Sequence, residues 1–488
     1  MQKTCIFVEN NRTMLDQSFS YDTINTVFMQ SNRKGQVKKE FLSAEYLEAA
    51  KEYRVMRHSI NSLKKISKEI RTEEQETEIL ELEIKMKDNA IKQKDLLTKC
   101  LFKISEGINR RGFKFTLTSK QSDDPKKPNY LIGKTAEEFF AMKILCRNLK
   151  HTFNLQMSSR NNILSQVKQL LGEDKHPKYI IRTDIQHCFE SIPHNQLFKI
   201  IDDNTLLDYK NKTMLKGLIC NEFEKKNCRC LVTTSNTGIP RGCAISSYLA
   251  ELYLSKIDQD IKQKIGEIIY YNRYVDDIII IIHPVQTPKD NKAIDYYKSL
   301  IENIFKEKGL TLSPDKTIVI DAKTGKSYEF DFLGYRFSIS NSIVKVCHSS
   351  KKIKKTITRI NKIFDTFSNL LSIDYLKAKS YLFDALRILT ANTNLHNNKK
   401  GIKIGAYYSN QILDNSSVLS LYDKYLEKKI AKISLPISGF GSEMERKTEE
   451  DKLKRVLLKN ANFVKGFESR KRFCISKRRL QVIKRSWV

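Results

Sequence analysis

The stretch that decides the fold is YNRYVDDIIIIIHP, which runs from Tyr271 to Pro284. Its run of isoleucines, Ile278 to Ile282, has the length of a strand, and a β-branched run of this kind is typical of a strand that is buried on both faces. Asp276 and Asp277 directly precede the run. Adjacent carboxylates repel each other unless a cation compensates their charge, so the stretch predicts a hairpin that carries a divalent metal ion. A solvated turn is the alternative reading of such an Asp pair.

A second aspartate follows a second apolar strand, in YIIRTDIQHCFESIPHNQL from Tyr179 to Leu197. If the two strands are neighbours in one sheet, Asp184 and Asp276 converge at one edge of it. Carboxylate oxygens at that edge can hold two Mg²⁺ ions, as in-line phosphoryl transfer requires, and the carbonyl of Ile185 is expected to add a ligand. Because strand side chains alternate, Asp277 is expected to point differently and to have a supporting role.

A glycine-containing loop stands between these two strands in the sequence, in TGIPRGCAISSYLAELYLSKID. Gly238, Pro240 and Gly242 restrict the conformation of this loop, and Ser246 begins an amphipathic helix. Glycines let the backbone approach a base or a phosphate closely. The loop is therefore a candidate nucleotide-binding element.

Basic residues outnumber acidic ones, because 87 Lys and Arg against 56 Asp and Glu leave a net charge of +31 on 488 residues. This balance favours a polyanionic partner, and compositional bias toward Lys contributes to the balance. The content of 40% hydrophobic residues excludes wholesale disorder. The segment Arg470 to Val488 interleaves basic residues with Phe473 and Trp487 and has no acidic residue. Such a segment suits phosphate contact with base stacking, and a disordered basic tail is the alternative.

The sequence shows no sign of export or of membrane insertion. An acidic residue and an Asn pair in MQKTCIFVENNR come before any apolar core long enough for a signal peptide, and no later run approaches the ~20 apolar residues of a membrane span. The ten cysteines lack the spacing of a disulfide scaffold. We therefore expect free thiols, a cytoplasmic location and no membrane partner.

Five motifs stand in the order and at about the spacing of the core motifs of reverse transcriptases, the RNA-directed DNA polymerases. The chain resembles this family over at least Arg160 to Phe337. The motifs are RTDIQHCFESI, GIPRGCAISSYLAELYL, YNRYVDD, LTLSPDKT and FDFLGYRF.

The resemblance implies roles for individual residues. Asp184, Asp276 and Asp277 match the catalytic carboxylates that bind two Mg²⁺ ions. Phe189 matches the aromatic gate that clashes with a ribose 2′-hydroxyl, which implies the use of dNTPs. Lys316 matches a lysine that protonates the pyrophosphate leaving group.

Further matches concern substrate and primer. Arg160 matches an arginine near the incoming nucleotide or the template, and Arg241 stands where many relatives have Gln. A guanidinium there cannot offer an amide to the nucleotide, and it is expected to bind phosphate or to alter template choice. The implied primer grip is Phe332, Leu333, Gly334 and Tyr335, and the implied substrate-binding residues are Arg160, Ile185, Phe189, Gly238, Pro240, Arg241, Gly242 and Tyr274.

The implied fold is an α+β right-hand polymerase. Helical periodicity from Tyr46 to Ile104, on both sides of the polar stretch TEEQET, predicts a helical hairpin near the N-terminus. The expected parts are an N-terminal helical extension in residues 1–101, fingers in 102–183, a palm with an antiparallel sheet and part of the fingers in 184–345, a helical thumb in 346–435 and a basic extension in 436–488.

Three segments resemble bacterial defence-associated reverse transcriptases, and among these the first polymerase of type 3 systems. They are MLDQSFSYDTINTVFMQSNRKG, the helical arm and GIKIGAYYSN. The resemblance implies a bacterial cytoplasmic enzyme of antiphage defence whose partners are dNTPs, an RNA template or noncoding RNA, a DNA product, and a second reverse transcriptase or a further copy of the chain. A template-independent terminal transferase, for which Arg241 leaves room, and a catalytically idle RNA-binding scaffold of the same fold remain as alternatives.

Overall fold

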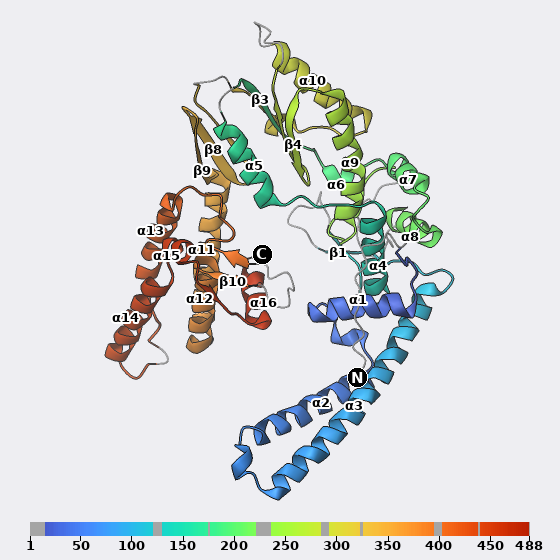
Figure 1. Ribbon diagram of the computed structural model, residues 1–488. Helices are drawn as coiled ribbons and strands as arrows, with labels where there is room; N and C mark the ends of the chain where they lie inside the picture. The colour runs from blue at the N-terminus through green and yellow to red at the C-terminus, as the bar shows by residue number, and fades with distance from the viewer. Residues whose placement is uncertain are drawn as a thin grey trace. The chain divides into compact units, whose positions relative to one another are not determined.

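The structure is a computed structural model (Figure 1), and it describes residues 15–120, 129–173, 176–220, 236–284, 292–322, 326–394, 403–437 and 440–487. The chain forms two compact units, each made of separate stretches of sequence. Unit 1 takes its residues from Met1–Gln156, Gln186–Asp260 and Ile304–Thr311, and unit 2 takes its residues from Met157–Ile185, Ile261–Asn303 and Leu312–Val488. Helices and antiparallel sheets occur together, which confirms the expected α+β class.

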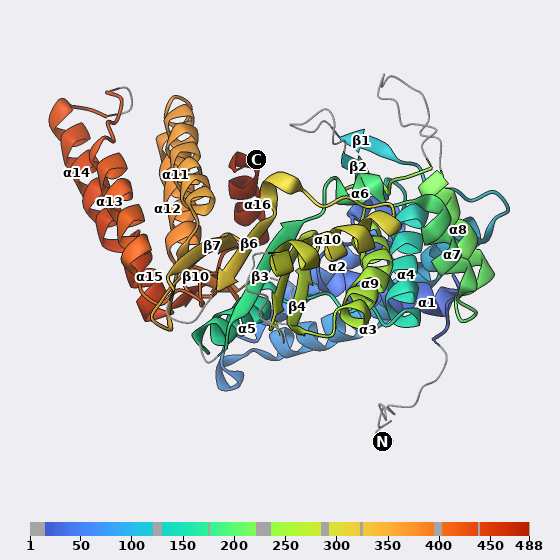
Figure 2. The same ribbon diagram turned by 90° about the horizontal axis from the view of Figure 1, so that it is seen from above.

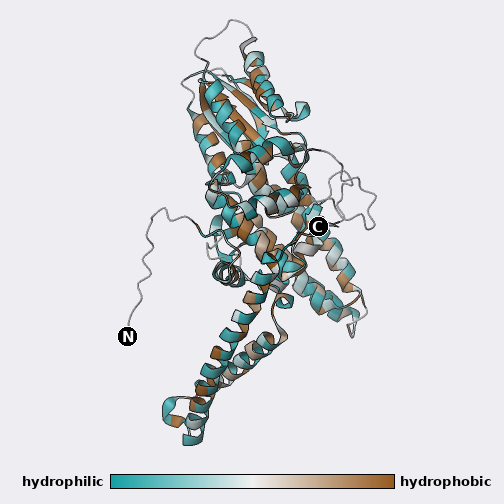
Figure 3. Ribbon diagram, turned by 90° about the vertical axis from the view of Figure 1, so that its right-hand side faces the viewer, coloured by the Kyte–Doolittle hydropathy of each residue, from teal (hydrophilic) through white to brown (hydrophobic). Residues whose placement is uncertain are grey.

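Unit 1 begins with α1 (Tyr21–Arg33) and contains the expected helical hairpin. Its helices α2 (Ala44–Leu63) and α3 (Glu73–Asn109) lie side by side, and polar and apolar residues are interleaved along both (Figures 1 and 3). The polar stretch TEEQET suggests a break between the two helices, but the break precedes it, because α2 ends at Leu63 and TEEQET begins α3. Thr72 caps the helix and forms a capping box with Gln75. The acidic residues of the first turn interact favourably with the helix dipole.

The rest of unit 1 is mainly helical. Asn148, which is fully buried on α4, donates to the carbonyl of Gln17 and to Oδ1 of Asn211, both at 3.0 Å, and so connects α4 to α8. The sequence pattern predicts a helix over 197–223, and the described part of this stretch contains two helices, whereas a strand predicted at 231–234 lies outside the described residues. The elements are η1 (Lys39–Phe41), η2 (Lys68–Ile70), β1 (Thr118–Lys120), β2 (Asn129–Leu131), α4 (Ala136–Thr152), α6 (Cys188–Ser191), α7 (His194–Asp203), α8 (Tyr209–Cys220) and α9 (Ser246–Lys264).

Unit 2 contains a four-stranded antiparallel sheet of order β4-β5-β3-β6. Its strands are β3 (Lys178–Asp184), β4 (Ile268–Tyr274), β5 (Asp277–Ile282) and β6 (Ile318–Ala322). Every isoleucine of the run Ile278 to Ile282 is fully buried, as the sequence predicts. The pairing of β3 with β5 places Asp184 directly opposite Asp277, so the two strands that carry the aspartates are neighbours.

An antiparallel sheet of order β7-β8-β9, a mixed sheet of order β11-β10-β12 and a group of helices complete unit 2. One apolar cluster joins α5, the first of these sheets and the helices. Figure 2 shows α11 and α12 side by side. The elements are α5 (Arg160–Gly172), α10 (Lys292–Glu307), η3 (Pro314–Lys316), β7 (Tyr328–Phe332), β8 (Tyr335–Ser340), β9 (Ile343–His348), α11 (Ser350–Leu371), α12 (Tyr375–Thr390), β10 (Asn392–Asn394), β11 (Lys403–Gly405), α13 (Ser417–Ala431), α14 (Glu443–Asn460), α15 (Phe463–Ser469), β12 (Arg472–Phe473) and α16 (Lys477–Ser486).

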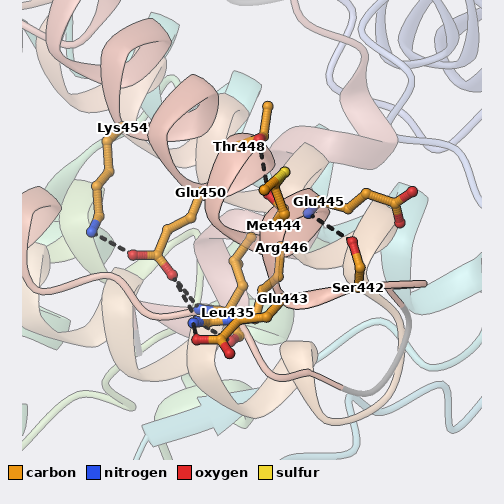
Figure 4. A network of polar contacts seen from close by, with 9 residues as sticks. All are labelled: Leu435, Ser442, Glu443, Met444, Glu445, Arg446, Thr448, Glu450 and Lys454. Carbon is orange, nitrogen blue, oxygen red and sulfur yellow. Dashed lines mark hydrogen bonds and ion pairs between the residues drawn. The ribbon is translucent and has the colours of Figure 1, made fainter.

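The start of α14 is held by a polar network (Figure 4). The hydroxyl of Ser442 accepts a hydrogen bond from the amide of Glu445, which caps the helix. Glu450 accepts from Lys454 Nζ at 2.7 Å and from the amide of Leu435 at 3.0 Å. Arg446 completes the network with an ion pair to Glu450. These contacts connect α14 to the segment that follows α13.

The basic C-terminal segment is folded against unit 2. Phe473 lies in β12, which pairs in parallel with β10, and its side chain is only 8% exposed. Ile475 and Ile483 are buried in the same apolar cluster, and Trp487 packs against it. The expectation of a disordered tail is therefore wrong, because the segment is folded and Phe473, Ile475 and Ile483 are part of the core. Burial leaves Phe473 no free face for base stacking, while phosphate contact by the segment and stacking by Trp487 stay predictions.

Three of the expected boundaries between parts fall inside elements. The boundary after residue 101 lies within α3, the boundary after residue 183 lies within β3, and the boundary after residue 345 lies within β9. None of the helices within the described ranges has the length and the low charge of a membrane-crossing helix. The seven cysteines that the structure describes are free thiols, as expected.

Candidate active site

The three aspartates come together in unit 2. Asp184 ends β3, Asp277 begins β5, and Asp276 lies in the turn between β4 and β5. One carboxylate oxygen from each lies within 4.8 Å of the others. Strand alternation predicts that Asp277 points away from Asp184 and Asp276, but its carboxylate lies with theirs. The reason is that Asp276 belongs to a turn, where the alternation of side chains does not apply. The convergence of Asp184 and Asp276 is confirmed.

The turn that carries Asp276 is tight and strained. Tyr274 pairs with Asp277, so only Val275 and Asp276 connect the two strands. Val275 has a φ of 62°, a value that is costly for a β-branched residue and that tight hairpins usually give to glycine. The buried side chain of Arg273 donates from Nη1 to the carbonyl of Val275 at 3.0 Å. This hydrogen bond fixes the strained turn and with it the position of Asp276.

The electrostatics of the cluster favour a bound cation. Burial raises the pKa of Asp276 above its ordinary value, and the charges of Asp184 and Asp277 raise it further, while Lys316 opposes this shift. All the donor atoms of the cluster are carboxylate oxygens, the ligands that hard divalent cations prefer. The three residues therefore fit a divalent metal site.

Two cations flank the carboxylates. Lys316, in η3, donates from Nζ to Oδ2 of Asp184, and its side chain is 55% exposed. Arg182 lies two residues before Asp184 on β3, so both side chains point to the same face of the sheet. Its Nη2 is 2.9 Å from Oδ1 of Asp277. Lys316 thus contacts Asp184, and its role toward the leaving group stays a prediction. Arg182 forms an ion pair with Asp277.

Backbone hydrogen bonds hold the cluster in place. The amide of Ile185 donates to the carbonyl of Asp276 at 3.2 Å, and the amide of Ser313 donates to the carbonyl of Asp184 at 2.8 Å. The hydroxyls of Thr183 and Thr317 lie 2.8 Å apart. Ile185 therefore has a positioning role through its amide, and a ligand role for its carbonyl stays a prediction. Tyr274 packs against the apolar cluster of unit 2.

The glycine-containing loop belongs to unit 1 and folds against Phe189. The amide of Ile239 donates to the carbonyl of Phe189, and the amide of Gly238 donates to that of Ile192, both at 2.8 Å. A Cβ on Gly238, whose φ is 102°, would lie 3.1 Å from the carbonyl oxygen of Glu190. Glycine is therefore required for this close approach.

Arg241 is held next to Phe189. Its Nη1 lies 3.3 Å from Oε1 of Glu190, and its guanidinium carbon lies 5.9 Å from the centroid of the Phe189 ring. The carbonyl of Arg241 accepts from the amide of Tyr130 at 2.7 Å. Gly242 also lies against Tyr130, whose carbonyl oxygen would be 3.0 Å from an added Cβ. The carbonyl of Pro240 accepts from the hydroxyl of Ser246, which starts α9.

The expected primer grip is the turn between β7 and β8 in unit 2. Phe332 pairs with Tyr335, and the two turn residues Leu333 and Gly334 both have positive φ, as a type I′ turn requires. Phe332 and Tyr335 are fully buried. Arg160 donates from Nη2 to the carbonyl of Leu333. The structure thus places Arg160 at this turn, and its expected proximity to nucleotide or template stays a prediction.

Several residues of these sites were not found from the sequence. Alternation along β3 could have indicated Arg182, since it shares a face with Asp184. Glu190 and Asn410 had no such signal, because each is recognised only by a contact between segments distant in the sequence. Asn410 hydrogen-bonds to Tyr335 and Lys352.

Comparison with known proteins agrees with this geometry. Residues 126–337 match the family model described as reverse transcriptase (RNA-dependent DNA polymerase). The putative COX1/OXI3 intron 2 protein of Saccharomyces cerevisiae is 22% identical over 303 residues, which cover 49% of this chain and 34% of that protein. The chain thus spans about a third of the length of this curated relative.

The similar solved structures include telomerases. Telomerase from Candida albicans, in complex with a fragment of telomeric RNA, is 12% identical at a TM-score of 0.35, with 79% of this chain and 64% of that chain covered. Apo telomerase from Candida tropicalis is 14% identical at a TM-score of 0.35, with 76% and 68% covered. The strands, the carboxylate cluster and the family match lead to one conclusion: residues 126–337 are similar to a reverse transcriptase domain, within a chain of the α+β class.

Proposed function

We propose that the protein is an RNA-directed DNA polymerase that adds dNTPs to a 3′-hydroxyl. The observation that carries this proposal is the cluster of Asp184, Asp276 and Asp277, whose oxygens lie within 4.8 Å of one another inside the matched domain. Three crowded carboxylates are costly for stability alone, and a metal-dependent phosphoryl transfer explains their presence.

The residues have distinct roles in the proposed reaction. Asp184, Asp276 and Asp277 hold two Mg²⁺ ions, with the carbonyl of Ile185 as a further ligand. Bound there, Mg²⁺ would lower the pKa of the attacking 3′-hydroxyl and neutralise the leaving pyrophosphate. Lys316 supplies a proton to that leaving group. Phe189 excludes a ribose 2′-hydroxyl, and the loop of Gly238, Pro240, Arg241 and Gly242 binds the nucleotide. Tyr274 is a further substrate-binding residue of the proposal.

The biological setting belongs to the same proposal. The resemblance of the N-terminal segment and the helical arm supports a cytoplasmic enzyme of bacterial antiphage defence. A noncoding RNA serves as its template or scaffold, DNA is its product, and a second reverse transcriptase or a further copy of the chain is a partner. The net charge of +31 supports binding to nucleic acid.

The first prediction tests the chemistry. Asp276→Asn combined with Asp277→Asn removes two of the charges that hold the metal ions, so incorporation of labelled dNTPs on an RNA template with a DNA primer should fall at least about 10²–10³-fold. Asp295→Asn, on the exposed surface of α10, is the matched control and should leave the rate unchanged.

The same assay separates the alternatives. Unchanged incorporation by the double variant would contradict the polymerase proposal, and a wild-type protein that binds RNA without incorporating any dNTP would identify the idle scaffold. The terminal transferase stays the second candidate because Arg241 stands where many relatives have Gln. The ion pair with Glu190 holds this side chain beside Phe189. Product that forms without template, with a sequence unrelated to any copurifying RNA, would establish that activity.

A further inference from the structure

Arg182 occupies a central position in the sheet that carries the aspartate cluster. It lies on β3, the strand that pairs with both β5 and β6, and its partners across the sheet are Ile279 and Ile318. Its side chain is only 18% exposed. Because Asp277 and Lys316 each precede one of these partners by two residues, the strand pairing brings both of them within reach of one guanidinium group.

The guanidinium group of Arg182 bridges two residues of the site. Its Nη2 donates to Oδ1 of Asp277 at 2.9 Å, and its Nη1 donates to the carbonyl of Lys316 at 3.2 Å. A planar guanidinium holds its donors in a fixed fork and so sets the directions of both partners at once, which a flexible ammonium group cannot do. Because Nη2 takes Oδ1, the direction of the second carboxylate oxygen of Asp277 is fixed as well.

The hydrogen bond to Lys316 extends this arrangement to a second aspartate. Lys316 donates from Nζ to Oδ2 of Asp184, and the amide of Ser313 donates to the carbonyl of Asp184 at 2.8 Å. Asp184 and Asp277 lie directly opposite each other in the pairing of β3 with β5. Arg182 therefore connects the segment that contacts Asp184 with the strand that carries Asp277.

Arg182 is unfavourable for stability at its position in β3. Its Nε is buried and has no hydrogen-bond partner among the residues that the structure describes. A buried donor without a partner destabilises the folded state. Ile180, two residues earlier on the same face of the strand, is fully buried, and an apolar residue in place of Arg182 would avoid the unpaired donor. A side chain that breaks a local rule of packing in this way is typical of a functional site.

The two cations beside the cluster differ in how firmly they are held. Lys316 reaches Asp184 with a side chain that is 55% exposed, whereas Arg182 is 18% exposed and is fixed by two hydrogen bonds. The flexible stem of a lysine lets Lys316 move aside when Asp184 takes a ligand. Arg182 keeps its place beside Asp277, so it can act on this carboxylate in every state of the site.

We propose that Arg182 is a positioning residue, which holds the carboxylate of Asp277 in the orientation that a divalent cation requires. The inference rests on the proposed function, because it takes the three aspartates to be metal ligands. Hydrogen bonds from outside a metal site orient its ligands, and loss of such a partner typically weakens metal binding by about 10–100-fold. A cation that only compensated charge would have the opposite effect, because its removal leaves the cluster more negative and strengthens the binding of a divalent ion.

The second prediction tests this role by metal binding alone. The full chain, without nucleotides or nucleic acid, is titrated with Mn²⁺, which also binds carboxylate oxygens and whose free form is measured by electron paramagnetic resonance. Arg182→Gln should weaken binding at the cluster by roughly 10–100-fold. Asp276→Asn combined with Asp277→Asn gives the background from other sites. Arg336→Gln is the matched control, because Arg336 pairs with Asp331 at 2.8 Å between β8 and β7, and it should leave the affinity unchanged.

A second variant keeps the test independent of folding. Arg182→Lys retains the charge but cannot contact Asp277 and Lys316 with one planar group, so it should also weaken Mn²⁺ binding, by less than Arg182→Gln does. Thermal unfolding in EDTA shows that each variant is folded before the titration. A purely structural arginine would lower the unfolding midpoint of Arg182→Gln in EDTA and leave the Mn²⁺ affinity of the folded variant unchanged.

Three results would overturn the inference. One is an unchanged Mn²⁺ affinity in folded Arg182→Gln and Arg182→Lys, and another is tighter binding in Arg182→Gln, which would assign the arginine to charge compensation. The third is an equal loss in Arg336→Gln. A wild type that binds no more Mn²⁺ than the variant with both asparagines would refute the metal site of the proposed function, and the inference with it, so the two failures are distinguishable.

Discussion

Asp276 shows at the scale of one residue how function opposes stability. Its carboxylate lies with those of Asp184 and Asp277, and burial together with their charges raises its pKa. The native state without metal therefore contains repulsion that an uncharged side chain would relieve. Lys316 and Arg182 compensate this repulsion only in part, since two cations face three carboxylates.

The third prediction follows from this conflict. Asp276→Asn should raise the thermal unfolding midpoint in EDTA by roughly 2–4 °C, because about 1 kcal/mol of repulsion and desolvation is removed. Mg²⁺ should raise the midpoint of the wild type more than that of the variant. Asp295→Asn should change neither value, and a lower midpoint for Asp276→Asn in EDTA would contradict the argument.

At the scale of elements, the C-terminal segment shows how basic composition can hide a core element. β12 pairs with β10, and α16 follows it with its buried Ile483. Arg387 of α12 lies 4.4 Å from the centroid of the Phe473 ring, and Arg359 of α11 lies 5.4 Å from that of Trp487. The aromatic residues thus face arginines of neighbouring helices and are packed within unit 2.

The fourth prediction concerns this segment. Phe473→Ala should lower the free energy of unfolding of unit 2 by about 3 kcal/mol, because it leaves a cavity in the apolar cluster. Trp487 is the only tryptophan of the chain, so its fluorescence in urea reports the change directly. Cys474→Ala, at the exposed neighbouring residue, should leave the midpoint unchanged. Equal stability of both variants would show that the aromatic ring is not part of the core.

At the scale of the whole molecule, the basic residues and the three aspartates have different proposed functions. The chain has a net charge of +31 and also contains a small acidic site of three aspartates. In the proposed function, Lys and Arg hold phosphates through interactions that salt screens, whereas the aspartates would hold metal ions through coordination. Retention of nucleic acid and catalysis therefore depend on different solution conditions.

The fifth prediction separates the two. Raising salt from 50 to 200 mM should weaken RNA retention by roughly 10³-fold or more if at least six phosphates are contacted. EDTA at low salt should stop dNTP incorporation and leave the RNA bound. Filter binding and incorporation assays on the same sample measure both effects. Release of RNA by EDTA alone would show that metal ions, and not Lys and Arg, retain it.

The sequence by itself determined the elements that carry the chemistry. The isoleucine run can only be a buried strand, and two aspartates that follow or precede such strands must meet if the strands pair. For this reason the pattern predicts β3, β5 and the convergence of Asp184 with Asp276 correctly, whereas the α+β class follows from the resemblance. Local patterns sufficed because strand burial and turn chemistry depend on residues close together in the chain.

Only the tertiary structure decided the contacts between distant segments. The ion pair of Glu190 with Arg241, the three hydrogen bonds accepted by Asn410 and the burial of Phe473 join residues that have no common pattern in the sequence. Composition alone does not show whether the C-terminal segment is packed or exposed. A basic stretch has the same composition whether its few apolar residues face solvent or a core. Packing decides between these states, since burial of those apolar side chains stabilises the fold while the charged ones stay in water.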